Sequence, residues 1–225
     1  MAYDFYVRSK QDLIDAVEEY GIVPYFSTSI PGFSLEEHCS PAVLFSDFED
    51  DTWAWKGPVI QATGCAYGKF FEKKSTYVSR EVFLDLANYR RDGYDFDARF
   101  DDGLASWQDK ELFELVDAAA PVVSTRLKAI GNYRKGGRKG FDSSMNRLQE
   151  QGYVLIDDFV YARDRHGKPY GWGLAEYSTP EKWMGEDFSA HVYEREPRES
   201  GERILARLRT LCPAASEDKL RSFLK

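Results

Sequence analysis

Apolar positions in the second half of the chain recur at helical spacing in three successive segments. Residues 107–119 carry an apolar stripe that follows a capping pattern at Ser106 and ends before Pro121. Shorter stripes follow over residues 124–130 and 142–151, and a glycine closes each of them. These patterns predict three consecutive helices.

Two segments of alternating pattern, residues 153–161 and 170–177, come directly after these helices. They predict the strands of a hairpin with a long connecting loop. The order helix, helix, helix, strand, strand is typical of a winged helix-turn-helix. The sequence therefore predicts a winged-helix domain over residues 104–183.

The rest of the chain predicts an α+β extension and a helical tail. Residues 1–103 hold a helix after Ser9 and short antiparallel strands that include residues 66–71 and 76–78. The polar stretch 90–103 is the predicted linker to the winged-helix domain, and residues 184–225 form the C-terminal helices. The predicted fold class is α+β: a winged helix-turn-helix domain with an N-terminal α/β extension containing short antiparallel strands and C-terminal helices.

Composition is typical of a soluble cytoplasmic protein. Of the 225 residues, 43% are hydrophobic and 15% aromatic, which is ample for a core, and the formal net charge is −8. No apolar run approaches the ~18 residues of a membrane span, and the N-terminus lacks a secretory signal pattern. Three scattered cysteines argue against a disulfide framework or a zinc ribbon. We therefore expect no membrane partner.

Positive charge is concentrated in one segment of this acidic chain. Residues 126–148 hold seven basic residues and one acid, Asp142, a net charge of +6, so the remainder sums to −14. This asymmetry predicts an electropositive surface for double-stranded DNA, although a solvated loop has the same signature. In a winged helix this segment leads into the reading helix, and further cations fall at the hairpin tip. The candidate DNA contacts are Arg126, Lys128, Arg134, Lys135, Arg138, Lys139, Arg147, Arg165 and Lys168.

Other clusters do not predict a metal or a cofactor. The acidic run 92–102 offers oxygen ligands, but Arg99 and Phe100 break the EF-hand pattern. Aromatic residues alternate with cations around Trp53 and Trp55, a pattern that can stack unpaired bases. At strand spacing such rings are more often core residues, so we expect these two tryptophans to be buried.

Several motifs resemble one family. Residues 141–151 and 177–183 are similar to the winged-helix DNA glycosylase superfamily of AlkZ and YcaQ. More narrowly, the W-x-W-K run at 53–56, the Y-G-K run at 67–69 and the stretch 88–97 resemble the short bacterial AlkZ-related proteins.

The resemblance implies winged helices that grip duplex DNA and excise alkylated bases through a Gln-x-Gln motif. The matching triplet is Gln149, Glu150 and Gln151, but its middle residue is charged, and it lies at the end of the predicted reading helix. We therefore favour a DNA-binding, reduced or non-catalytic relative. An active glycosylase on alkylated DNA and a protein-interaction module on a winged-helix scaffold are the alternatives.

Overall fold

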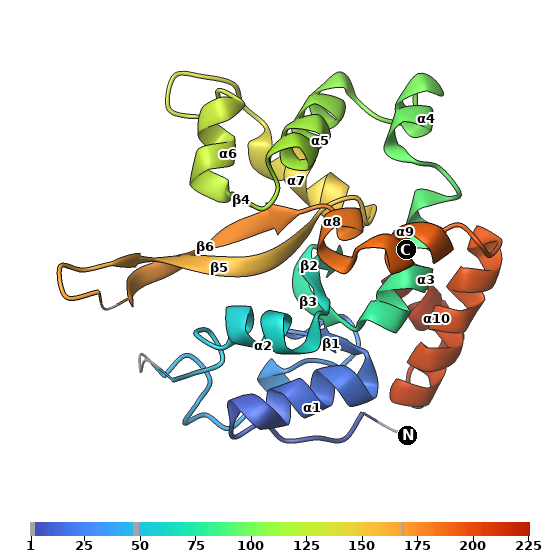
Figure 1. Cartoon of the computed structure of the whole chain (residues 1–225). Helices are drawn as coiled ribbons and strands as arrows, with labels where there is room; N and C mark the ends of the chain where they lie inside the picture. Colours follow the sequence, from blue (N-terminus) through green and yellow to red (C-terminus); the bar gives the residue numbers. More distant parts are fainter. Residues whose placement is uncertain (1–2, 47–49, 168) are drawn as a thin grey trace.

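A six-stranded antiparallel sheet runs through the molecule, which the computed structural model describes over residues 3–46, 50–167 and 169–225 (Figure 1). Its strand order is β1-β3-β2-β5-β6-β4, so N-terminal strands continue directly into the hairpin of the second half. The strands are β1 Ile22–Pro24, β2 Ala66–Phe71, β3 Lys74–Val78, β4 Val122–Val123, β5 Leu155–Arg163 and β6 Pro169–Ser178. The α+β class and the antiparallel N-terminal strands are confirmed.

Serine side chains cap two of the expected helices. Ser9 and Ser106 accept hydrogen bonds from the backbone N–H groups of Asp12 and Asp109, which satisfies donors that a helix leaves free. The helices are α1 Lys10–Tyr20, α2 Lys56–Thr63, α3 Arg80–Arg91, α4 Phe96–Asp101, α5 Trp107–Ala119, α6 Ser124–Ile130, α7 Phe141–Glu150, α8 Pro180–Met184, α9 Glu186–His191, α10 Pro197–Leu211 and α11 Glu217–Leu224, with a 3₁₀ turn at Glu36–His38.

The polar stretch 90–103 contains more structure than its pattern predicts, since Asp95 caps the short helix α4 and Phe96 enters a hydrophobic core. One expectation drawn from local pattern is wrong. Between Ser9 and residue 78 the sequence predicts one helix and short strands, but residues 56–63 form a further helix, α2. Pro58 lies in its first turn, where a missing N–H removes no helical hydrogen bond.

Buried side chains form two hydrophobic cores. The first joins α1, α3 and strands β1 to β3 to the C-terminal helices α10 and α11, so both ends of the chain share one core. The second joins α5, α6 and α7 around Leu112, Leu127 and Leu148. In the view of Figure 1 this second group lies above the β5–β6 hairpin, and α1 and α2 lie below it.

The guanidinium of Arg91 connects these two parts. Its side chain is 2% exposed and donates to the carbonyl of Gly152 from Nε (3.2 Å) and Nη2 (2.8 Å). Its Nη1 donates to Glu181 (2.6 Å) and to the hydroxyl of Tyr193 (3.0 Å). The guanidinium also lies 4.7 Å from the ring centroid of Tyr153. One residue of α3 therefore binds the end of α7, α8 and the segment after α9.

Replacing this arginine should cost far more stability than replacing an exposed one. Arg91→Met leaves the Gly152 carbonyl and Glu181 without their donors, so we expect a loss of about 3 kcal/mol in the free energy of unfolding. Arg209→Met, which breaks exposed ion pairs with Glu202 and Glu217, should leave the free energy of unfolding almost unchanged. Urea unfolding measures both losses, and equal losses would contradict the connecting role of Arg91.

Candidate nucleic-acid interface

The second half of the chain places a loop and a hairpin on the same side of the molecule. Strand β4, between α5 and α6, pairs antiparallel with β6 through Val122 opposite Tyr177 and Val123 opposite Glu176. This pairing fixes α6 at the base of the hairpin. The loop 131–140, which joins α6 to α7, and the far end of the hairpin both project to the left in Figure 1.

Backbone contacts hold the loop 131–140 in one shape. The carbonyl of Asn132 accepts a hydrogen bond from the N–H of Arg138 (2.6 Å), and the carbonyl of Lys139 accepts one from the Gln108 amide (2.7 Å). A Cβ at Gly137 would lie 2.1 Å from the Asn132 carbonyl oxygen, so this close approach requires glycine. The loop therefore presents its side chains from a defined backbone.

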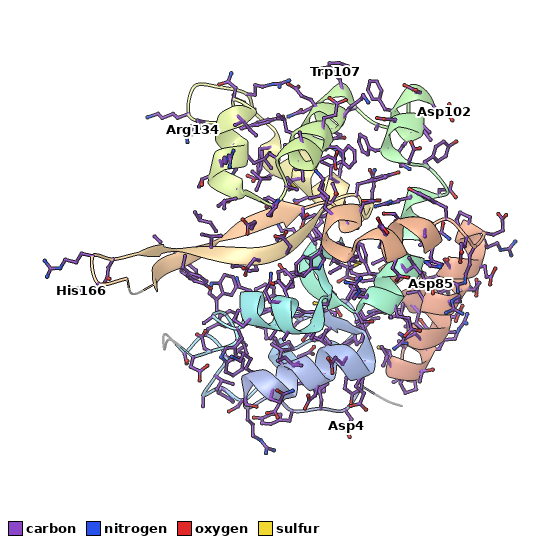
Figure 2. All side chains as sticks on the ribbon, in the orientation of Figure 1. Asp4, Asp85, Asp102, Trp107, Arg134 and His166 are labelled. Carbon is purple, nitrogen blue, oxygen red and sulfur yellow. The ribbon has the colours of Figure 1, made fainter. Side chains whose placement is uncertain are left out.

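Four cations of the basic segment are exposed and unpaired. Their side chains have no hydrogen bond or ion pair within the residues that the structure describes. One of them, Arg134, extends outward from the loop in Figure 2. The four are Arg126, Arg134, Lys135 and Lys139. Unpaired, solvated cations of this kind are available to a phosphate backbone.

The other three cations of the segment are engaged with carboxylates. Lys128 lies 3.4 Å from Asp142, and Arg138 lies 2.5 Å from Glu111 on α5. Arg147 donates to both carboxylate oxygens of the remaining partner, Asp109 on α5, at 2.9 and 2.7 Å. These pairs join the loop and α7 to neighbouring elements, so the seven cations do not act as one uniform surface.

The ion pair between Arg147 on α7 and Asp109 on α5 keeps the Asp109 carboxylate ionised. Burial raises the pKa of Asp109, but the hydrogen bonds from Arg147, Ser144 and Ser106 outweigh burial and leave this pKa below its usual value. The Asp109 side chain is 8% exposed but that of Arg147 is 45% exposed, so solvent screens the pair from the Arg147 side only. Arg147 therefore braces α5 against α7.

The hairpin tip carries a second, smaller basic group. Arg165 and His166 are exposed there, and Arg165 donates from Nε to the ring of His166 (3.0 Å). Figure 2 shows His166 at the far end of the hairpin. The remaining candidate, Lys168, lies outside the described residues. Further back on β6, the Trp172 side chain is 78% exposed.

The glutamine triplet is not brought together with these cations. Gln149 is 2% exposed, and its amide is used internally: Oε1 accepts from the backbone N–H of Lys69 (3.1 Å), and Nε2 donates to the Met145 carbonyl (3.2 Å). Glu150 and Gln151 instead line a cavity of about 520 Å³ that α3, the β2–β3 turn and α11 complete. None of the basic loop lines that cavity.

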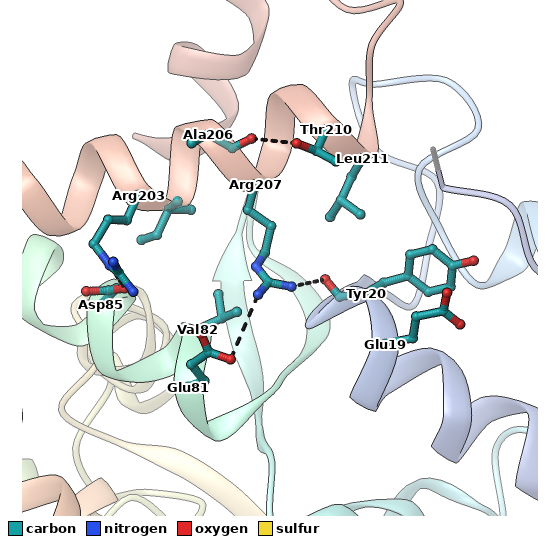
Figure 3. A pocket seen from close by; sticks show the side chains of 11 residues that line it. Glu19, Tyr20, Glu81, Val82, Asp85, Arg203, Ala206, Arg207, Thr210 and Leu211 are labelled. Atoms are coloured by element: carbon teal, nitrogen blue, oxygen red, sulfur yellow. Dashed lines mark hydrogen bonds and ion pairs between the residues drawn. The ribbon is translucent and has the colours of Figure 1, made fainter. Parts of the chain in front are cut away.

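A cavity of about 500 Å³ lies between α1, α3 and α10 (Figure 3). Its two arginines are already paired, since Arg207 donates to the Tyr20 carbonyl (3.2 Å) and lies 3.9 Å from Glu81. Arg203 donates to the buried carboxylate of Asp85 (2.7 Å). These contacts hold α10 against α1 and α3. The cavity is therefore a space between packed helices, and both arginines that line it are already paired.

The acidic run and the aromatic pair that the sequence indicated as possible sites have structural roles. Asp95 caps α4, and Asp97 lies 2.7 Å from Lys110, so the acidic run 92–102 is engaged locally. Residues 3–46, 50–167 and 169–225 contain no group of three side chains that could hold a metal ion and no helix long and apolar enough to cross a membrane. Trp55 is 4% exposed, as expected, whereas Trp53 is only partly buried.

The sequence did not predict the burial of two titratable groups near the base of the hairpin. Lys56 begins α2, and Asp157 lies at an irregularity of β5 between Ile156 and Asp158. Burial, with repulsion from Glu176, raises the pKa of Asp157 to about 7. The sequence shows only a W-x-W-K run and paired aspartates, and neither pattern reveals burial.

An α+β protein with a well-ordered basic loop and a projecting hairpin that carries further cations belongs among the candidates for nucleic-acid binding. The chain is a member of the AlkZ-related family, because the family model described as "AlkZ related" matches residues 7–225. Membership points to a DNA-binding or DNA glycosylase-like role. Searches of curated proteins and of solved structures gave no match.

The two glutamines should differ in what they contribute to stability. Gln149→Ala removes two internal hydrogen bonds and leaves the Lys69 N–H without its acceptor, so we expect a loss of about 1–2 kcal/mol. Gln151→Ala, at the edge of a cavity, should change stability by less than about 0.5 kcal/mol. Thermal and urea unfolding compare the variants; a neutral Gln149→Ala would show that the internal bonds carry no weight.

Asp157 should make the protein less stable as the pH rises. Its pKa in the folded state is about 7, above that of the unfolded chain, so the folded state holds a proton that the unfolded state loses from about pH 4 upward. Stability therefore falls between about pH 4 and pH 7. Asp157→Asn should match the wild type at pH 4 and exceed it by about 4 kcal/mol at pH 8 in urea unfolding. Parallel pH profiles would contradict this assignment.

Proposed function

We propose that the protein binds double-stranded DNA through the loop 131–140 and the β5–β6 hairpin, used as the reading segment and wing of a winged helix. The observation that carries this proposal is the set of four exposed, unpaired cations on α6 and the loop: Arg126, Arg134, Lys135 and Lys139. Family membership supports the same partner.

The order of elements supports the winged-helix assignment. Helices α5, α6 and α7 are followed by the hairpin, and the short strand β4 between α5 and α6 pairs with the second hairpin strand. In such a fold the third helix reads the major groove with its N-terminal residues. Here that helix is α7, and the basic loop leads directly into it.

The paired and unpaired cations have separate roles in this proposal. Arg138 and Arg147 bind carboxylates on α5 and fix the loop relative to α7. The unpaired cations then meet phosphates without having to break an existing ion pair. Because the rest of the chain is acidic, the field of the protein orients the duplex toward this one face.

Binding without base excision by the glutamine triplet is the function that the geometry favours. An excision residue must place its side chain against the flipped nucleotide. The Gln149 amide is buried, and both its oxygen and its nitrogen are hydrogen-bonded inside the protein. Of the triplet, only Glu150 and Gln151 are therefore open to a ligand. The cavity that these two residues line contains no residue of the proposed DNA-binding loop or hairpin.

Removing positive charges from the loop should weaken DNA binding and also reduce its dependence on salt. A triple variant, Arg134→Gln, Lys135→Gln and Lys139→Gln, removes three phosphate contacts, so the slope of log Kobs against log salt should fall by about 3. Fluorescence anisotropy with a labelled duplex measures both affinity and slope.

A control variant that loses the same number of cations elsewhere distinguishes loss of DNA contacts from a change in net charge. The triple variant Lys10→Gln, Arg198→Gln and Lys219→Gln removes three exposed cations on α1, α10 and α11 and should leave the slope unchanged. An equal loss in both triple variants, or wild-type binding that does not respond to salt, would overturn the proposed face. Capture of a protein without nucleic acid would favour the interaction-module alternative.

A further inference from the structure

Trp172 is the most exposed of the large apolar side chains among the described residues, at 78%. It is the fourth residue of β6, near the turn of the hairpin that projects from the molecule in Figure 1. Val160 and Leu174, which face each other in the strand register close to it, are exposed as well. One apolar residue on a surface is ordinary, but three at adjoining positions are typical of a contact site.

Other side chains hold the Trp172 ring from one side. Its centroid lies 5.6 Å from that of Trp53, with the two planes at 89°, an edge-to-face geometry that aromatic pairs prefer. Trp53 is held in turn by the Lys56 ammonium, whose Nζ lies 3.2 Å from the Trp53 ring centroid. A ring that is fixed in this way loses little side-chain freedom when it binds a flat partner.

Cations lie on the same hairpin, close to this ring. About 10 Å of strand separates Trp172 from the turn that carries Arg165 and His166, which equals about three base steps of DNA. The acid of this turn, Asp164, accepts a hydrogen bond from the backbone N–H of His166 (2.8 Å) and so supports the turn. Proteins bind unstacked bases with aromatic rings beside cations, since the cations hold phosphates while a ring stacks on a base.

An intact duplex offers no free base face to this ring, because each base is stacked on its neighbours. Insertion between two paired bases has to overcome their stacking first. An unpaired base avoids most of that cost, since it leaves the stack more easily than a paired one. The ring therefore strengthens binding more on a duplex that an unpaired nucleotide interrupts than on a continuous duplex.

We propose that Trp172 is a stacking residue that makes the protein prefer duplex DNA with an unpaired nucleotide over fully paired DNA. The cations of the loop 131–140 and of the hairpin turn hold the phosphates, and the indole stacks on the unpaired base. This inference rests on the proposed function, because the ring reaches a base only when the hairpin lies on DNA.

Two duplexes of one sequence test this preference, one fully paired and one with a single extra adenine in one strand. Fluorescence anisotropy measures the affinity of the full chain for each. We expect the wild type to bind the bulged duplex about tenfold more tightly, within the range that one stacked base contributes. Trp172→Ala should bind both duplexes with the wild-type affinity for paired DNA. Its salt slope should be unchanged, because the indole holds no phosphate.

Matched variants and a second readout support the assignment. Trp172→Phe keeps an aromatic face and should retain most of the preference. Trp107→Ala removes another strongly exposed tryptophan, on α5, and should leave the preference unchanged. With 2-aminopurine as the unpaired base, its fluorescence should fall on binding to the wild type but not to Trp172→Ala. Thermal unfolding verifies that each variant folds.

Failure of this inference and failure of DNA binding give different results. Equal affinity of the wild type for the two duplexes, or the same loss on both in Trp172→Ala, overturns the stacking role while duplex binding stands. If neither duplex binds in a salt-dependent manner, the proposed function fails and this inference fails with it. A dimer that Trp172→Ala dissociates in analytical ultracentrifugation would show that a second copy covers the ring, which also overturns the inference.

Discussion

The buried guanidinium of Arg91 is the contact on which the arrangement of the molecule depends. A charge removed from water is costly unless hydrogen bonds and an opposite charge replace the lost hydration. Arg91 receives both, from the Gly152 carbonyl, Glu181 and Tyr193. Because Gly152 directly follows α7, this contact sets where α7 stands relative to α3, and so it also sets the position of the basic loop and the hairpin.

The chain uses its cations in two physically different ways. Those that bind carboxylates, such as Arg147 with Asp109, fix one element against another and project little free charge. Those without a partner among the described residues, such as Arg134 and Lys135, are exposed and available to an anion. The net charge of a segment therefore overstates the surface that a polyanion can meet. Of the seven cations in residues 126–148, only four lack a carboxylate partner within the part of the chain that the structure describes.

Local pattern predicts the elements here better than it predicts their partners. The helices after Ser9 and Ser106 and the hairpin follow from capping and periodicity, which act over a few residues. Helix α2 was missed because its buried face includes Lys56 and Gly57, which do not give the apolar pattern of a helix.

The candidate site could be read from the sequence only in part. The exposed cations follow from composition, but their neutralising partners do not, since Arg147 meets Asp109 across 38 positions. Gln149 likewise accepts a hydrogen bond from the backbone of Lys69 across 80 positions, a contact that the Gln-Glu-Gln motif does not predict. The burial of Lys56 depends on Phe159, which no local pattern places beside it.

In the proposed function, duplex DNA lies across the loop 131–140 and the hairpin. Amide hydrogen exchange of the full chain, with and without a saturating duplex, maps that contact most directly. We expect slower exchange in residues 131–145 and around the hairpin tip, with little change in α1, α10 and α11. Protection over the helices of the first core, or bound DNA that leaves the basic loop exchanging as before, would contradict it.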